Sequence, residues 1–150
     1  MFRGHYEHAI DGKGRTSLPS RFREVLSARG DTRLVITTGL DHCLEAWPMP
    51  EWINFEIELS KRPQFNSKIK KLKRIYVSNA VECDLDKLGR VLVPASLRKY
   101  ADLKKEVVWA GMGKNIELWD RPAYEQMRAA ALDDPEERVA LEQELEELGL

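Results

Sequence analysis

The segment Asp11-Gly12-Lys13-Gly14-Arg15 places a carboxylate, two glycines and two cations in five consecutive residues. An aspartate at the start of a turn accepts hydrogen bonds from the backbone N–H groups that follow it, and Gly14 supplies the left-handed backbone such a turn needs. An arginine just past the turn is suited to bidentate contacts with phosphate or with the guanine edge in the major groove. A two-stranded β element fits that groove. These residue types favour an anion-binding tip.

The same residues also admit a structural interpretation, in which Asp11 and Arg15 form an internal salt bridge that fastens the turn. Such a bridge does not require further cations nearby, yet residues 1–30 contain six basic residues against three acidic ones. Arg21 and Arg23 follow closely and could support a DNA-reading tip built on Lys13 and Arg15. From the residues alone, both interpretations stay open.

Enzymatic chemistry is not expected. The sequence contains no GxxxxGK[ST], GxSxG or HExxH motif. Asp11 and Asp86 could be considered as a carboxylate pair, but each has an arginine close by that would keep it ionised and occupied. The two cysteines are far apart and the three histidines do not cluster with them, so we expect free thiols, no metal site and no cofactor.

The chain repeats itself. Residues Ile10–Arg23 match Leu85–Arg98 at an offset of 75, with Asp, Gly, Arg, Pro and the last Arg identical. The match resumes at an offset of 72, where Leu44-Glu45-Ala46-Trp47 corresponds to Ile116-Glu117-Leu118-Trp119. We therefore predict two copies of one supersecondary element that superpose about a pseudo-two-fold axis. The expected organisation is repeat 1 at 5–47, a helical connector at 48–75, repeat 2 at 76–119 and C-terminal helices at 120–150.

Each repeat has the same predicted layout. A strand leads into the turn, a second alternating strand follows, a proline opens a short helix, and a hairpin completes the repeat. The predicted second strands are Thr16–Leu18 and Val91–Val93, and the predicted hairpins join Leu34–Thr38 to Leu44–Trp47 and Val107–Ala110 to Ile116–Trp119. Further helices are expected at Glu51–Ser60, at Asn66–Tyr76 with an apolar stripe of Phe65, Ile69, Leu72 and Tyr76, at Arg121–Leu132 and after Asp134.

Charge is distributed unevenly along the chain. The formal net charge is −1, but residues 61–74 contain seven basic residues and no acidic one, whereas residues 133–150 contain eight acidic residues and one arginine. A basic body with an acidic tail is compatible with an anionic partner, although 61–74 could also be a solvated helix face. We expect the tail, with its leucine stripe, to serve assembly more than DNA contact. No apolar run approaches a membrane span, and the first residues lack a signal core, so a cytoplasmic location is expected.

The residues that carry a family resemblance are the start Met1-Phe2-Arg3-Gly4, the two Asp-x-x-Gly-Arg turns, and the Leu18-Pro19 and Val93-Pro94 pairs. They resemble the MraZ family over about residues 1–132. The resemblance implies an α+β, mainly β fold, a double-split β-barrel of the SpoVT/AbrB type formed by two pseudo-symmetric units with flanking helices. It also implies a ring-shaped homo-oligomer in the cytoplasm and nucleoid. Such a ring would bind short direct repeats in promoter DNA and repress the division and cell-wall gene cluster, including its own gene.

The family's DNA-facing motif is Asp-x-x-x-Arg, which falls on Asp11 and Arg15, and again on Asp86 and Arg90. Leu88 stands where the first turn has Lys13, so we expect the first repeat to contribute more. The predicted DNA-binding set is Arg3, Asp11, Lys13, Gly14, Arg15, Arg21, Arg23, Asp86, Lys87, Arg90 and Arg98. The alternatives are an antitoxin-like protein that binds a partner through 133–150, and a purely structural oligomer.

Overall fold

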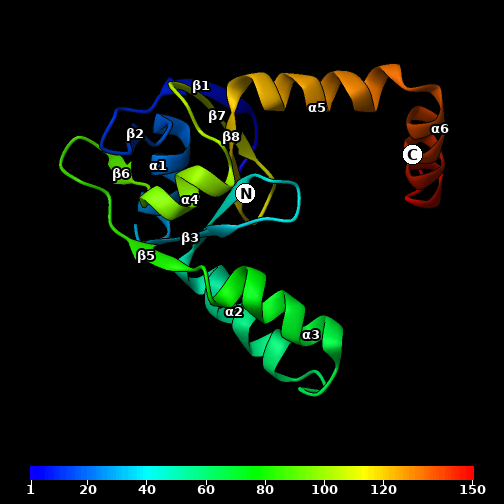
Figure 1. Cartoon of the computed structure of the whole chain (residues 1–150), viewed down its shortest axis with the longest axis horizontal. Coiled ribbons are helices and arrows are strands. Elements are labelled where there is room, and N and C mark those ends of the chain that lie inside the picture. Colours follow the sequence, from blue (N-terminus) through cyan, green and yellow to red (C-terminus); the bar gives the residue numbers. More distant parts are fainter. The chain divides into compact units, whose positions relative to one another are not determined.

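The computed structural model describes all residues from 1 to 150, which form two compact units, Met1–Asp120 and Arg121–Leu150 (Figure 1). The second unit contains only the helices α5 (Arg121–Asp133) and α6 (Pro135–Glu147). The first unit contains the strands β1 (His5–Ala9), β2 (Arg15–Ser17), β3 (Leu34–Thr38), β4 (Leu44–Pro48), β5 (Val81–Cys83), β6 (Arg90–Leu92), β7 (Glu106–Gly111) and β8 (Ile116–Asp120). Its helices are α1 (Ser20–Ala28), α2 (Met49–Ser60), α3 (Ser67–Leu72), the π-helical turn η1 (Lys73–Val77) and α4 (Ala95–Tyr100).

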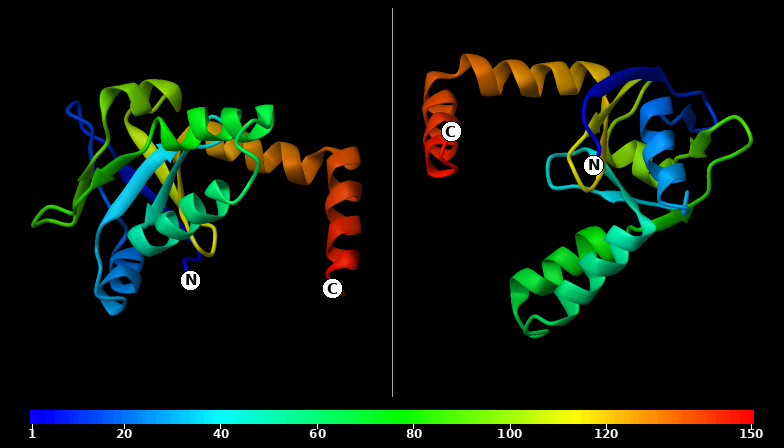
Figure 2. Two further views of the ribbon diagram at one scale, coloured as in Figure 1. Left: turned by 90° about the horizontal axis from the view of Figure 1, so that it is seen from below. Right: turned by 180° about the vertical axis from the view of Figure 1, so that it is seen from behind.

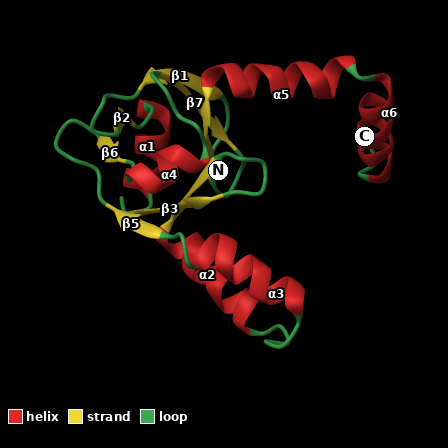
Figure 3. Ribbon diagram, viewed as in Figure 1, coloured by secondary structure: helices red, strands yellow, loops and turns green.

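All strand pairs are antiparallel. Six strands form one sheet in the order β1-β7-β8-β4-β3-β5, and β2 pairs with β6 in a separate two-stranded ribbon (Figure 3). The predicted α+β class is confirmed. The expectation of a mainly β protein is correct only inside the two repeats. The connector and the C-terminal segment are both helical, so over the whole chain helices contain more residues than strands.

The strand pairings exchange between the repeats. β1 of repeat 1 pairs with β7 of repeat 2, and its counterpart β5 pairs with β3 of repeat 1. Two further pairings between the repeats join equivalent strands, β2 with β6 and β4 with β8, with Thr16 opposite Val91 and Glu45 opposite Glu117. These partners are separated by 75 and 72 residues, which are the two offsets of the sequence repeat. At the centre of each of these two strand pairs, equivalent residues therefore face each other. The bounds of the repeats at 5–47 and 76–119 stay a prediction.

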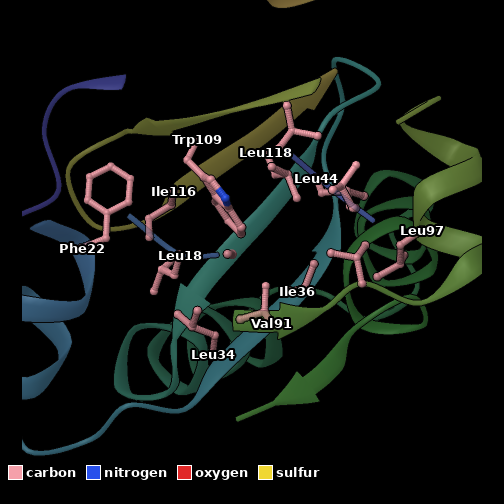
Figure 4. Close-up of a cluster of buried hydrophobic side chains, with 14 of the residues drawn as sticks. Leu18, Phe22, Leu34, Ile36, Leu44, Val91, Leu97, Trp109, Ile116 and Leu118 are labelled. Carbon is pink, nitrogen blue, oxygen red and sulfur yellow. The ribbon is translucent and has the colours of Figure 1, made fainter. Parts of the chain in front are cut away.

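The main core lies between the inner face of the sheet, the ribbon and the short helices α1 and α4. Strand alternation selects its members: in β4, Leu44 and Ala46 point into the core while Glu45 and Trp47 point to the opposite face. Each fully buried large apolar side chain contributes about 1.5–3 kcal/mol. The residues labelled in Figure 4 are Leu18, Phe22, Leu34, Ile36, Leu44, Val91, Leu97, Trp109, Ile116 and Leu118.

On the outer face, the helical connector packs through a small aromatic cluster. Trp47 of β4 meets Trp52 and Phe55 of α2, and Phe55 contacts Tyr76 of η1. The helix predicted at 66–76 is present, but as α3 followed by a π-helical turn. Its predicted apolar stripe is wrong at Phe65, which is 94% exposed because it precedes the helix cap.

Two other expectations can be compared with the structure. Cys43 is buried, Cys83 is half-buried, and both are free thiols, as predicted. None of the helices is both long and apolar enough to cross a membrane.

A buried carboxylate sits on the outer face, where Glu45 faces Glu117 across the paired strands β4 and β8. Glu45 accepts hydrogen bonds from the Tyr76 hydroxyl at 2.8 Å, from the Trp47 indole at 3.2 Å and from the Asn115 amide at 3.3 Å. Burial nevertheless raises its pKa above the ordinary value, because these bonds do not replace all of the lost hydration.

We predict that Glu45→Gln raises the melting temperature at pH 7. The raised folded-state pKa means that protonated Glu45 is favoured in the folded protein, so wild-type stability falls as pH rises through that pKa. Glutamine mimics the protonated form and does not titrate. The advantage should therefore vanish below about pH 4, where Glu45 is protonated in both states.

The measurement is a thermal melt followed from pH 4 to pH 8, with the exposed Glu56→Gln on α2 as the control, which should match wild type throughout. A Glu45→Gln protein less stable than wild type at pH 7 would show that the three hydrogen bonds outweigh desolvation.

Candidate nucleic-acid interface

The first turn is organised by one carboxylate. Oδ1 of Asp11 accepts the backbone N–H groups of Lys13 and Arg15 at 3.0 and 2.9 Å, and Oδ2 accepts Nε–H of Arg15 at 2.8 Å. The N–H of Gly14 donates to the Asp11 carbonyl at 3.0 Å and closes the turn. The side chain of Arg15 therefore leaves the turn in a defined direction.

The second turn repeats this arrangement atom for atom. Asp86 accepts the N–H groups of Leu88 and Arg90 at 2.9 and 2.8 Å, and Nε–H of Arg90 at 2.8 Å. In both turns the arginine uses only Nε, and its side chain stays 39% exposed at Arg15 and 31% exposed at Arg90. The internal salt bridge and the DNA-reading tip are thus compatible, because a bond through Nε leaves the two Nη groups of each arginine as donors for an anion.

The charge of each turn is stable to pH. Hydrogen bonds from the backbone N–H of Arg15 and from its guanidinium lower the pKa of Asp11 to about 2, and the corresponding bonds from Arg90 lower the pKa of Asp86. A lowered carboxylate pKa gives a stabilising interaction that is complete above the ordinary value and is lost only as pH falls through the folded value. Both ion pairs therefore persist at neutral pH.

The ribbon sets the two arginines on one exposed side. Arg15 lies opposite Leu92 and Ser17 lies opposite Arg90, while the central pair, Thr16 and Val91, is buried beneath them. Arg15 and Arg90 are diagonal neighbours, which corresponds to a separation of about 7–8 Å in an antiparallel pair. That separation fits within a major groove about 12 Å wide.

Each turn is braced by the opposite repeat. The N–H of Val93 donates to the carbonyl of Gly14 at 2.8 Å, and Arg98 lies over the first turn, donating from Nε to Val93 at 3.1 Å and from Nη1 to the Gly12 carbonyl at 3.4 Å. By the same exchange, Arg23 lies against Gly89 of the second turn. Arg23 and Arg98 are half-buried behind the turns, where Arg98 donates hydrogen bonds to Val93 and Gly12 and Arg23 packs against Gly89.

The remaining predicted residues fall in two places. Lys13 and Lys87 are exposed on the two turns. Arg3 and Arg21 instead line a separate hollow of about 580 Å³ between the N-terminus and α1, together with Tyr6 and Glu24, and no turn residue lines it. The structure does not bring these two arginines to the ribbon.

Sequence reasoning missed the apolar part of the exposed ribbon. Leu92 is 56% exposed beside Arg15, and Leu88 is 67% exposed at the tip of the second turn. Apolar side chains contact the thymine methyl in the major groove. The offset of 75 could have indicated Leu92. When β2 pairs antiparallel with its equivalent strand β6 about Thr16 and Val91, Leu92 lies opposite Arg15.

Comparisons with known proteins give a consistent picture. The family model described as "MraZ protein, putative antitoxin-like" matches residues 1–75 and again residues 76–143. The chain is 42% identical over 137 residues to the "Transcriptional regulator MraZ" of Pelotomaculum thermopropionicum, covering 91% of this chain and 92% of that protein. It is 41% identical over 150 residues to the protein of the same name from Thioalkalivibrio sulfidiphilus, covering 100% of both chains.

The backbone of the first turn yields a prediction. Gly14 has φ +92°, and a Cβ there would lie 2.4 Å from the carbonyl oxygen of Val93, whereas a Cβ at Gly12 would meet nothing within 4 Å. Gly14→Ala should therefore lower the free energy of unfolding by about 1–3 kcal/mol. Gly12→Ala is the matched control and should stay within about 0.5 kcal/mol of wild type. Urea unfolding measures both, and equal stabilities would contradict the described turn.

Proposed function

The chain belongs to the MraZ family, and from this premise we propose that it is a transcriptional regulator that binds duplex DNA through the β2–β6 ribbon and its two flanking turns. The observation that carries the proposal is the pair of matching Asp–Arg turns, in each of which a partly exposed arginine binds the aspartate through Nε and keeps its Nη groups as further donors. Two such groups on one side of a β ribbon match the way guanine edges and phosphates are bound.

Recognition in this proposal follows from how the side chains are held. Arg15 and Arg90 enter the major groove with their guanidinium planes already oriented by aspartate, so little rotamer freedom is lost on binding. Lys13 and Lys87 lie on the turns and contact phosphates, which position the protein without reading bases. Leu88 replaces the cation in the second turn, so the first turn makes the larger electrostatic contribution.

The fold that we propose for this interface is the double-split β-barrel of the SpoVT/AbrB type. The exchanged pairings support it, because β1 and β5 each complete the sheet of the other repeat and the ribbon joins both repeats. In such an arrangement each turn forms within one repeat and rests against the other repeat.

We further propose that the protein acts as an oligomeric ring on direct repeats. One base-reading arginine discriminates by about 1–3 kcal/mol, whereas specific and non-specific binding differ by about 4–10 kcal/mol. Linked contacts raise avidity by about 10²–10⁴. A ring presenting several ribbons would therefore bind repeats spaced about one helical turn, or 10 bp, apart.

The proposed targets are promoter repeats of the division and cell-wall gene cluster, including the regulator's own gene. Occupancy of these promoters would repress transcription, and the protein would work in the cytoplasm at the nucleoid.

A second candidate is an antitoxin-like interaction protein. The exposed leucines of α6 favour it, since an acidic helix with apolar side chains can bind another protein. A gel shift at physiological salt on the DNA upstream of the protein's own gene discriminates the candidates, because only the regulator retains that DNA specifically.

The arginine pair gives a direct prediction. Arg15→Ala should abolish specific retention of the upstream DNA without unfolding the protein, because the Arg15 side chain is 39% exposed and its bond to Asp11 lies outside the core. Arg90→Ala should weaken binding less. The control is Lys99→Ala on α4, which removes an exposed cation away from the turns. Wild-type binding by Arg15→Ala would contradict the proposed interface.

The multivalent mechanism has its own test. Affinity should rise steeply from one repeat to two and three, and a 5-bp insertion between repeats should remove that gain because it turns the next site to the opposite side of the duplex. Titrations with DNA fragments of equal length keep non-specific binding constant. Equal affinity for one repeat and three, or no effect of the insertion, would refute the ring-based mechanism even if DNA is bound.

A further inference from the structure

We infer that the acidic helix α6 of one chain docks on the basic helical arm of a neighbouring chain. The basic arm is defined as α2, the loop after it, α3 and η1, residues 49–77. The inference rests on the proposed ring, for which it names the two contacting surfaces, and it concerns a part of the molecule that the DNA interface does not use.

The basic arm has an excess of positive charge, because its seven cations outnumber the three glutamates of α2. Residues 61–74 contain seven basic residues and no acidic one, and the ion pair within the arm joins Lys61 to Glu58 at 3.0 Å. The arm also exposes apolar side chains: Ile53 and Ile57 lie one helical turn apart on α2, and Phe65 is 94% exposed. A surface that combines a cationic field with apolar side chains suits an anionic partner that also has an apolar side.

Helix α6 has the complementary properties. Residues 133–150 contain eight acidic residues and one arginine, and that arginine, Arg138, pairs with Glu142 of the same helix at 3.3 Å. Leu141, Leu145 and Leu148 recur at helical spacing and are about half to three-quarters exposed. The net charge of this segment is −7, whereas residues 61–74 have a net charge of +7 and the whole arm, with the three glutamates of α2, has a net charge of +4.

Charge alone would not hold such a contact. Exposed ion pairs are individually weak, and salt screens them over about 8 Å at physiological ionic strength. The leucines of α6 and the isoleucines of the arm supply apolar surface that leaves water when the helices meet. The charges then select the partner and the orientation.

The repeat explains why the occupant is another copy of this chain. Helices α2 and α5 begin at residues 49 and 121, an offset of 72, so α5–α6 is the second repeat's version of the arm. The arm follows β4 and α5–α6 follows β8, and these two strands pair with each other. A chain that carries both a basic and an acidic segment can bind another copy head to tail, and such contacts can close into rings.

The arm is also separate from the DNA interface. In Figures 1 and 2 it extends from the sheet on a side away from the β2–β6 ribbon. A duplex bound to the ribbon therefore leaves the arm available for a neighbouring chain.

The test uses two charge-reversed proteins, both altered at exposed positions. One carries Lys68→Glu and Lys71→Glu on α3, and the other carries Glu144→Lys and Glu147→Lys on α6. Glutamate at 68 in the first turn of α3 and lysine in the last turn of α6 agree with the helix dipoles. Residue 71 lies in the last turn of α3, where glutamate is less favourable, so circular dichroism checks that the helix content is retained. Molar mass is measured by light scattering after size exclusion, without DNA.

Wild type should assemble, each reversed protein alone should shift to a smaller mass, and an equimolar mixture of the two should recover the large mass. Recovery is expected because each reversed surface meets a reversed complement on the other protein. The matched control is Lys99→Glu with Lys114→Glu, two exposed lysines outside the arm, which should keep the wild-type mass. Leu145→Ser should also lower the mass, since it removes apolar contact without changing charge.

Several outcomes would overturn the inference. Unchanged mass in both reversed proteins would mean that other surfaces build the ring. Loss of assembly without recovery in the mixture would place the contact within one chain. An arm variant that assembles normally but loses non-specific affinity for duplex DNA would make the arm a nucleic-acid surface. A monomeric wild type would overturn the proposed ring as well, while the Arg15→Ala gel shift would still test DNA binding separately.

Discussion

The antiparallel pairing of equivalent strands from the two repeats is the constraint on which the rest of the structure depends. Thr16 faces Val91 in the ribbon, and Glu45 faces Glu117 in the sheet, so each repeat supplies half of both elements. A two-stranded ribbon is only marginally stable by itself. Burial of Thr16 and Val91 over the shared core holds it in place, and the ribbon therefore depends on both repeats being folded together.

This exchange determines the chemistry of the turns. Arg98 of one repeat covers Gly14 of the other, and Arg23 lies in the same way against Gly89. Contacts from the opposite repeat therefore hold each turn in the free protein. Salt bridges from Asp11 and Asp86 orient the side chains of Arg15 and Arg90. Rigid, preoriented arginines on a β ribbon bind anions with a smaller loss of conformational entropy than free side chains. The structural interpretation of each salt bridge does not compete with the proposed DNA-binding one, because the bond uses only Nε of the arginine.

Local patterns predicted the turns, the hairpins and most helices, because these depend on residues close in sequence such as Asp11, Gly14 and Pro19. They did not predict that β2 pairs with β6, since the register of two distant strands depends on the shared core. For the same reason the bracing positions of Arg23 and Arg98, and the exposed Leu92 beside Arg15, emerged only from the structure. The prediction that Phe65 belongs to the apolar stripe of α3 was wrong. Its spacing in the sequence fits the stripe, but Phe65 precedes the N-cap Asn66 and is therefore not part of the helix.

The most direct test of the central claim is a structure of the protein bound to a duplex of its own upstream DNA. The account predicts the β2–β6 ribbon in the major groove, with Nη atoms of Arg15 and Arg90 at hydrogen-bonding distance from base edges or phosphates and both Asp–Arg bonds through Nε intact. DNA bound on another surface, such as the basic arm, or arginines that must leave their aspartates to reach it, would contradict the account.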